Sequence, residues 1–123
     1  MQKTVKDEAR DERIMMEIVV DCYGPEEQAM GWYAYLEDTL QFPFSARCMA
    51  ERSISPLQVG DEVEVLGMAP AEECEHEMFV QTPWGKRNLA VPLAQLTPIN
   101  ATDDKTQEAV ADWHYWINQG YEL

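Results

Sequence analysis

Basic residues are scarce in this sequence: 9 Lys plus Arg stand against 23 Asp plus Glu in 123 residues, a formal net charge of −14. Binding to nucleic acid requires a basic face, and attraction to anionic membranes requires basic segments, so the composition argues against both. A surplus of carboxylates attracts cations instead. The same charge also keeps a protein soluble, so composition alone leaves both interpretations open.

Cysteine is also scarce, and long apolar runs are missing. The three cysteines, Cys22, Cys48 and Cys74, are odd in number and widely spaced. This pattern argues against a disulfide framework and favours a reducing compartment. Residues 1–13 are densely charged, unlike a secretory signal, and no apolar run approaches the length of a membrane span. We therefore expect a cytoplasmic protein.

The motifs of common catalytic and metal sites are absent. The sequence has no glycine-rich phosphate loop, no G-x-S-x-G elbow and no EF-hand calcium loop. A zinc site built on Cys74 and His76 would need two more ligands, and only a tertiary coincidence would supply them from Cys48 and His114. A metal-dependent hydrolase would lack a distinctive nucleophile or base. We expect no enzyme, and any calcium site must combine separate segments.

The N-terminal third is predicted to be helical. Residues 1–6 are expected to be frayed, and apolar residues at Ile14, Ile18 and Cys22 predict an amphipathic helix over 7–22. Gly24 and Pro25 separate it from a second helix, because glycine ends helices and proline begins them. The apolar face of that second helix comprises Ala29, Tyr33, Leu36 and Leu40.

From Phe44 onward the pattern changes to short strands. Strands are predicted over 44–51, 62–66, 78–82 and 88–92, with a loop at 67–76 and a turn at 83–85. A last helix opens at Thr102-Asp103-Asp104 and ends at Gly120. The predicted fold class is α+β: two N-terminal helices, a small antiparallel SH3-like barrel or sheet, and a C-terminal helix, in one domain spanning 1–123.

The acidic residues are separated from the basic ones along the chain. Residues 14–46 contain six acidic residues, residues 53–85 contain seven, and neither stretch contains a Lys or Arg. Nine positive side chains cannot neutralise 23 negative ones even if the fold pairs them all. Carboxylates that lie close together without a partner favour binding of a cation.

Glu37 and Asp38 form the first candidate calcium site. They fall in the last turn of the second predicted helix, where the helix dipole makes each negative charge unfavourable by roughly 0.3–1 kcal/mol. The free carbonyl groups of that turn, near Thr39, Leu40 and Gln41, add oxygen ligands. Ca²⁺ takes about six to eight oxygens, so this is a suitable ligand set. A solvated helix end is the alternative.

The second candidate is the run Glu72, Glu73, Glu75 and Glu77. In an extended segment Glu73, Glu75 and Glu77 would point the same way at intervals of about 7 Å. Such a row could collect a cation together with acids from another segment. The alternative is an exposed acidic loop.

Four segments resemble the cyanobacterial CcbP family of calcium-binding proteins: GWYAYLEDTLQFPF (31–44), VGDEVEVLGMAPAEECEHEMFV (59–80), LAVPLAQLTP (89–98) and DWHYWINQGY (112–121). The resemblance runs in the same order from about Arg13 to the C-terminus. It implies a cytoplasmic calcium buffer without EF-hands, linked in filamentous cyanobacteria to heterocyst differentiation.

The resemblance also implies roles for particular residues and partners. Asp38 would be the leading Ca²⁺ ligand, with Glu37 and the acids of 72–77 as neighbours. The protein would hold calcium until the protein itself is removed, and a regulatory protease is therefore a candidate partner. The rival hypothesis is an acidic adaptor that docks on a basic partner protein, with metal binding incidental.

Overall fold

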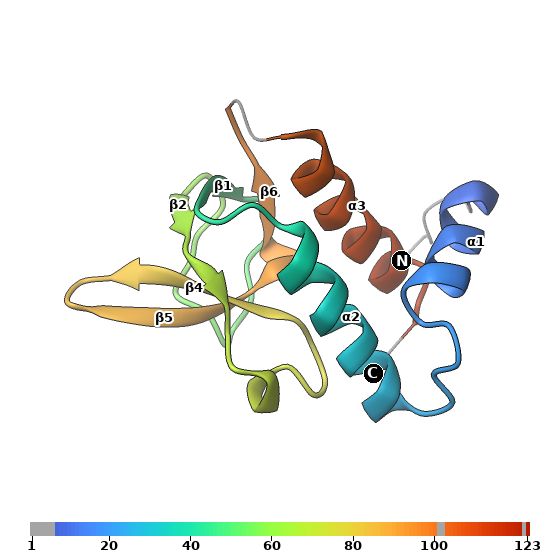
Figure 1. The fold of residues 1–123 in the computed structure, drawn as a ribbon. Coiled ribbons are helices and arrows are strands. Elements are labelled where there is room, and N and C mark those ends of the chain that lie inside the picture. The colour runs from blue at the N-terminus through green and yellow to red at the C-terminus, as the bar shows by residue number, and fades with distance from the viewer. Residues whose placement is uncertain (1–6, 101–102, 122) are drawn as a thin grey trace.

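Two N-terminal helices, a set of short strands and a C-terminal helix make up the computed structural model, which describes residues 7–100, 103–121 and 123. The helices are α1 (Glu8–Glu17), α2 (Pro25–Thr39) and α3 (Asp104–Asn118). They gather on one side of the molecule, with α2 and α3 side by side, and the strands lie on the other side (Figure 1). The described residues thus confirm the predicted α+β class.

The strands form two small antiparallel sheets. One has the order β2-β1-β6, from β2 (Glu62–Val65), β1 (Phe44–Cys48) and β6 (Leu96–Pro98). The other has the order β3-β4-β5, from β3 (Gly67–Met68), β4 (Phe79–Trp84) and β5 (Arg87–Pro92). Only Leu66 separates β2 from β3, so the chain passes directly from one sheet to the other. This matches the small antiparallel barrel or sheet expected from the sequence.

Aromatic side chains of α2 and α3 form the centre of the hydrophobic core. Trp32 of α2 is fully buried, and its ring centroid lies 5.1 Å from that of Trp113 and 5.5 Å from that of Trp116. Aromatic rings at such separations contribute packing energy beyond the burial of their area. Ala29, Leu36 and Leu40 of the predicted α2 face are buried as expected, whereas Trp32 at the centre of the packing was not part of that face.

The predicted first helix is too long by about one turn. α1 ends at Glu17, and Asp21 adopts a left-handed conformation with a φ of 58°. A β-carbon on Gly31 of α2 would lie only 2.5 Å from the Ile18 carbonyl oxygen, so the chain after α1 packs directly on the backbone of α2. Burial of Ile18 and Val19 against the core thus prevails over continuation of the helix.

The strand predictions hold in part. β3 and β6 were not predicted, because runs of two and three residues carry no periodic signal. β1 ends at Cys48, three residues short of the prediction. The β4–β5 turn lies at Gly85-Lys86, where Gly85 has a φ of 63°, so Pro83 and Trp84 belong to the strand rather than to the turn.

At the C-terminus, α3 begins directly after its cap Asp103, as expected, and Gly120 follows its end with a φ of 90°. The expected fraying of residues 1–6 and the role of Thr102 lie outside the described residues.

Candidate calcium site

The C-terminal end of α2 carries two of the predicted ligands. Glu37 and Asp38 lie in its last turn and are exposed, while Leu36 beside them is buried. The amide of Leu40 donates to the Leu36 carbonyl at 2.9 Å and closes the helix. In the described part of the chain, the next carbonyls receive no backbone hydrogen bond, so the oxygens of Glu37, Asp38 and Thr39 remain open to a ligand.

The Tyr33 hydroxyl connects this helix end to the Glu-rich segment. It donates to the Ala69 carbonyl at 2.8 Å, which ties α2 to the chain just before the short 3₁₀ helix η1 (Ala71–Glu73). Burial raises the pKa of Tyr33, and the nearby carboxylates of Glu37 and Glu72 raise it further. One acid from each predicted cluster thus lies within electrostatic range of the same hydroxyl group.

The Glu-rich segment is not an extended strand. Glu73 lies in η1, the following Cys74 is buried, and the chain then bends before β4. The condition under which Glu73, Glu75 and Glu77 would point the same way is therefore not met. A buried thiol fixes the turn at this point, since the amide of Phe79 donates to the Cys74 sulfur at 3.4 Å.

Glu77 already has a cationic partner. The Arg52 guanidinium donates to its two carboxylate oxygens at 2.7 Å and 2.9 Å, and this pairing raises the pKa of Arg52. Such a two-point contact is among the stronger ion pairs and competes with a metal ion. Glu77 is thus the least available of the predicted ligands.

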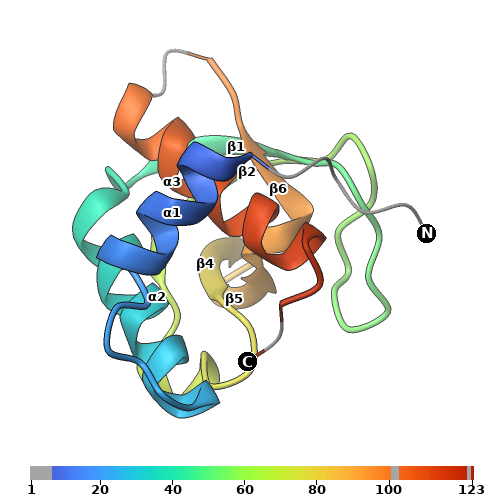
Figure 2. The same ribbon diagram turned by 90° about the vertical axis from the view of Figure 1, so that its right-hand side faces the viewer.

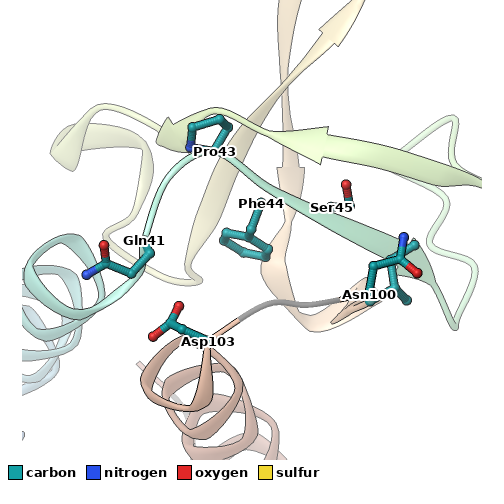
Figure 3. Close-up of a pocket in the computed structure, with 7 residues that line it drawn as sticks. Gln41, Pro43, Phe44, Ser45, Asn100 and Asp103 are labelled. Atoms are coloured by element: carbon teal, nitrogen blue, oxygen red, sulfur yellow. The ribbon is translucent and has the colours of Figure 1, made fainter.

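Gln41 lies on the opposite side of the helix end, next to the start of α3. The backbone N–H of Gln41 donates to the Thr106 hydroxyl at 2.9 Å, and that hydroxyl donates to the Asp103 carboxylate at 2.6 Å. The second hydrogen bond lowers the pKa of Asp103. Gln41 and Asp103 both line an open pocket of about 400 Å³ (Figure 3).

Asp103 and Asp104 are neighbours of the site that the sequence did not predict. Asp103 shares the pocket with Gln41, and Asp104 lines a second pocket with Thr39 and Lys105. More than 60 residues separate these acids from α2 along the chain, so no local spacing could have indicated the proximity. Lys105 reduces the negative charge on this side of the helix end.

Four of the five described arginines are used elsewhere in the fold. Arg10 and Arg13 pair with Asp112, Arg47 pairs with Glu62, and Arg52 pairs with Glu77. Across residues 7–100 and 103–121, no Lys or Arg comes within ion-pair distance of five exposed acids on the last turn of α2 and on the η1 segment. We call this group the α2–η1 acidic surface: Glu37, Asp38, Glu72, Glu73 and Glu75.

The acidic surface is not a preformed metal cage. Over the described residues, no group of three or more His, Cys, Asp or Glu side chains is placed to hold one metal ion. A cation here would use two or fewer carboxylates at a time and complete its shell with carbonyl oxygens, the Tyr33 hydroxyl and water. Ca²⁺ accepts such mixed, flexible oxygen shells.

The zinc alternative receives no support from the described residues. Cys48 and Cys74 are buried at separate places, and their sulfurs contact backbone groups nearby. The Nε2 atom of His114 donates to the Leu96 carbonyl at 2.7 Å, and burial lowers the pKa of this histidine. Cys48, Cys74 and His114 thus have structural contacts of their own.

Comparison with known proteins identifies the class to which this fold and its acidic surface belong. The model of the CcbP family, described as calcium binding, matches residues 12–117, so the chain belongs to that family. The solved structure of CcbP from Anabaena is 43% identical over the whole of both chains, with a TM-score of 0.86.

A second solved structure, of a calcium-binding protein in its calcium-binding form, is 42% identical over the whole of both chains, with a TM-score of 0.85. A search among curated proteins found no match. The family therefore confirms the resemblance noted in the sequence, and Ca²⁺ is the ion with which this family is associated. In the described part of the chain, no helix is long and apolar enough to cross a membrane.

Proposed function

We propose that this protein binds Ca²⁺ at the α2–η1 acidic surface and acts as an acidic calcium buffer without EF-hands. Asp38 and Glu37 supply the first carboxylates, and the open carbonyls of the last α2 turn, including that of Thr39, supply neutral oxygens. Glu72 of η1 lies within electrostatic range of Tyr33, one turn before Glu37, and Glu73 and Glu75 follow it in the chain. Gln41 lies on the opposite side of the helix end.

A single observation carries this proposal: exposed acids lie at the negative end of a helix, and no described cation pairs with them. Both the dipole and the mutual repulsion of the carboxylates destabilise the ion-free state. A divalent cation relieves both effects at once. Binding should therefore stabilise the fold as well as remove free calcium from solution.

The proposed activity is reversible binding without a chemical step. The exposed, loop-assembled oxygen shell favours a dissociation constant of roughly 10⁻⁷–10⁻⁴ M, the range of sensors and weaker sites. Mg²⁺ should compete poorly, because it demands near-ideal octahedral geometry and gives up its water reluctantly. We accordingly propose a cytoplasmic binding protein and no enzyme.

Isothermal titration calorimetry tests the site directly. Ca²⁺ titrated into the unmodified protein should give a saturable isotherm, and Glu37→Gln with Asp38→Asn should remove its tightest phase. Glu51→Gln is the matched control, because it removes an exposed carboxylate outside the acidic surface. An isotherm unchanged in the double variant would reject the assignment.

The rival adaptor function makes a different prediction for melting. A calcium buffer should melt at a higher temperature in millimolar Ca²⁺ than in EDTA, because the ion binds the folded state. An adaptor whose acidic surface docks on a basic protein should show no such shift. Equal melting temperatures would therefore favour the adaptor.

The proposed physiological role is the control of heterocyst differentiation. If the host is a filamentous cyanobacterium, calcium sequestration by this protein would restrain heterocyst differentiation until a regulatory protease removes the protein. Overexpression of the unmodified gene should then lower heterocyst frequency, and overexpression of the Glu37→Gln/Asp38→Asn variant should not.

A further inference from the structure

The tip of the β4–β5 hairpin combines an exposed indole with two cations. Trp84 ends β4 and stands directly opposite Arg87, the first residue of β5, with Lys86 in the turn between them. Trp84 is 45% exposed, whereas the other three tryptophans of the chain are buried. Figure 1 shows the hairpin pointing away from the three helices.

The Trp84 side chain lies on the face of β4 that packs on the core, but at a position beyond the edge of the core. Side chains alternate along a strand, so Val80, Thr82 and Trp84 share one face of β4. Val80 and Thr82 are fully buried, and Trp84 lies one step beyond them in solvent. Exposed tryptophans of this kind are typical anchors of protein–protein contacts.

The two cations at the tip are available for pairing. Lys86 and Arg87 are exposed, and neither forms an ion pair with any residue in the described part of the chain. Arg10, Arg13, Arg47 and Arg52, in contrast, all have acidic partners. The tip is therefore a positive point on a protein of net charge −14.

Distance also separates the tip from the rest of the protein. Two further residues on β4 extend past the buried Thr82, at about 3.3 Å each, which places the end of the strand about 7 Å beyond the core. This is close to the screening length at physiological ionic strength, about 8 Å, so the acidic body only partly cancels the local positive potential.

β5 provides an edge along which a peptide could pair. It is the last strand of the order β3-β4-β5, so one side of its backbone has no neighbouring strand within the described residues. Asn88 beside the tip is exposed, and Leu89 and Ala90 are half-buried. An extended segment can add to such an edge through main-chain hydrogen bonds.

We propose that Trp84, Lys86, Arg87 and the open edge of β5 form a docking surface for an extended acidic segment of a partner protein. The partner's carboxylates pair with Lys86 and Arg87, an apolar side chain covers Trp84, and the partner's backbone pairs with β5. A short segment fits better than DNA or an anionic membrane, because a long polyanion would also meet the acidic body of the protein.

A fluorescein-labelled decapeptide of alternating Glu and Val, observed by fluorescence anisotropy, provides the test. It should bind the unmodified protein more weakly as salt rises, because the pairing is electrostatic. Lys86→Gln/Arg87→Gln should weaken binding by about threefold to tenfold, the range expected for two exposed ion pairs. Trp84→Ala should weaken it as well.

Lys105→Gln is the matched control, since it removes one exposed cation elsewhere and should leave peptide binding unchanged. A peptide with Gln in place of Glu should not bind. The proposal is overturned if the Gln peptide binds equally well, if Lys105→Gln has the same effect as the tip variants, or if no binding occurs.

Vesicles with phosphatidylserine and a short DNA duplex serve as competing ligands in the same assay. Loss of their binding in the tip variants, together with no peptide binding, would also overturn the proposal in favour of a membrane or nucleic acid. Calcium titrations of the tip variants should match the unmodified protein, so this result is independent of the calcium site.

Discussion

Two groups of carboxylates in this protein have opposite surroundings. Asp112 of α3 is fully buried, and it accepts hydrogen bonds from Arg10 at 2.7 Å, from the Tyr35 hydroxyl at 2.7 Å and from Arg13. The α2–η1 acidic surface is exposed and has no cationic partner among the described residues. Figure 2 shows α1, which carries the two arginines, lying over α3.

The difference shows that a neighbouring cation of the protein decides whether an acidic residue stabilises the fold or remains available to a metal ion. Around Asp112 the protein supplies its own counter-charges, and the cluster joins α1 to α3. The pairing moves the pKa of Arg13 further above its usual range, and burial together with Asp112 raises the pKa of Tyr35 to about 12. At the end of α2 no described Lys or Arg forms an ion pair with Glu37 or Asp38, so a calcium ion can act as their counter-charge.

Removing the charge of Asp112 should produce the largest effect. Asp112→Asn leaves Arg10 and Arg13 without the carboxylate that they share, and breaking a buried pair costs about 3–5 kcal/mol. Because both arginines retain some access to water, we expect about 3 kcal/mol of lost unfolding free energy in calcium-free buffer. Urea denaturation in EDTA measures it. A loss below the effect of Asp104→Asn, an exposed acid of the same helix, would contradict the structural role.

Calcium should stabilise the folded protein by a slightly smaller amount. At a free Ca²⁺ concentration 100 times the dissociation constant, the gain is about 2.7 kcal/mol for one site. Glu37→Gln/Asp38→Asn should lose this gain because the principal carboxylates are missing. Paired urea denaturations in Ca²⁺ and in EDTA provide the measurement, with Glu51→Gln expected to retain the full gain.

In the absence of calcium, the same end of α2 should be more stable without its acids. Asp38→Asn removes a negative charge from the negative end of the helix, which should raise the free energy of unfolding by about 0.3–1 kcal/mol. This direction is opposite to that of Asp112→Asn. Urea denaturation in EDTA at low salt resolves it, and a decrease in stability would mean that Asp38 has a stabilising partner.

The smallest effect should be a pH dependence in the buried region. Burial lowers the pKa of His114, so the unfolded chain, with an ordinary histidine pKa of about 6.5, takes up a proton more readily than the folded protein. The contribution of His114 to stability is therefore present above pH 6.5 and declines as the pH falls below it. His114→Gln should flatten this decline in urea denaturations between pH 7.5 and 5.5, and His76→Gln, at an exposed position, should not.

The sequence predicted the helices and their apolar faces well because these signals are periodic and local. Ala29, Leu36 and Leu40 of the predicted α2 face are buried as expected. The same reasoning extended α1 through Ile18 and Val19, because a helical period cannot reveal that the backbone of Ile18 packs on Gly31 of another helix. β3 and β6 were missed because they are too short for any pattern to develop.

For the candidate site, the sequence indicated the acids but not their neighbours. The position of Glu37 and Asp38 at a helix end follows from local signals. The approach of Glu72 through Tyr33, the pairing of Glu77 with Arg52 and the nearness of Asp103 are all tertiary contacts. Their residues are remote in sequence, so only the fold could distinguish available carboxylates from paired ones.

The central claim is that calcium binds where the protein lacks its own cations. A crystal soaked in CaCl₂, with anomalous difference density collected for calcium, tests this most directly. We predict a peak at the C-terminal end of α2 with carboxylate oxygens of Glu37 or Asp38 in its shell, and none beside Asp112. A fully occupied calcium peak elsewhere, with none at the end of α2, would contradict the account.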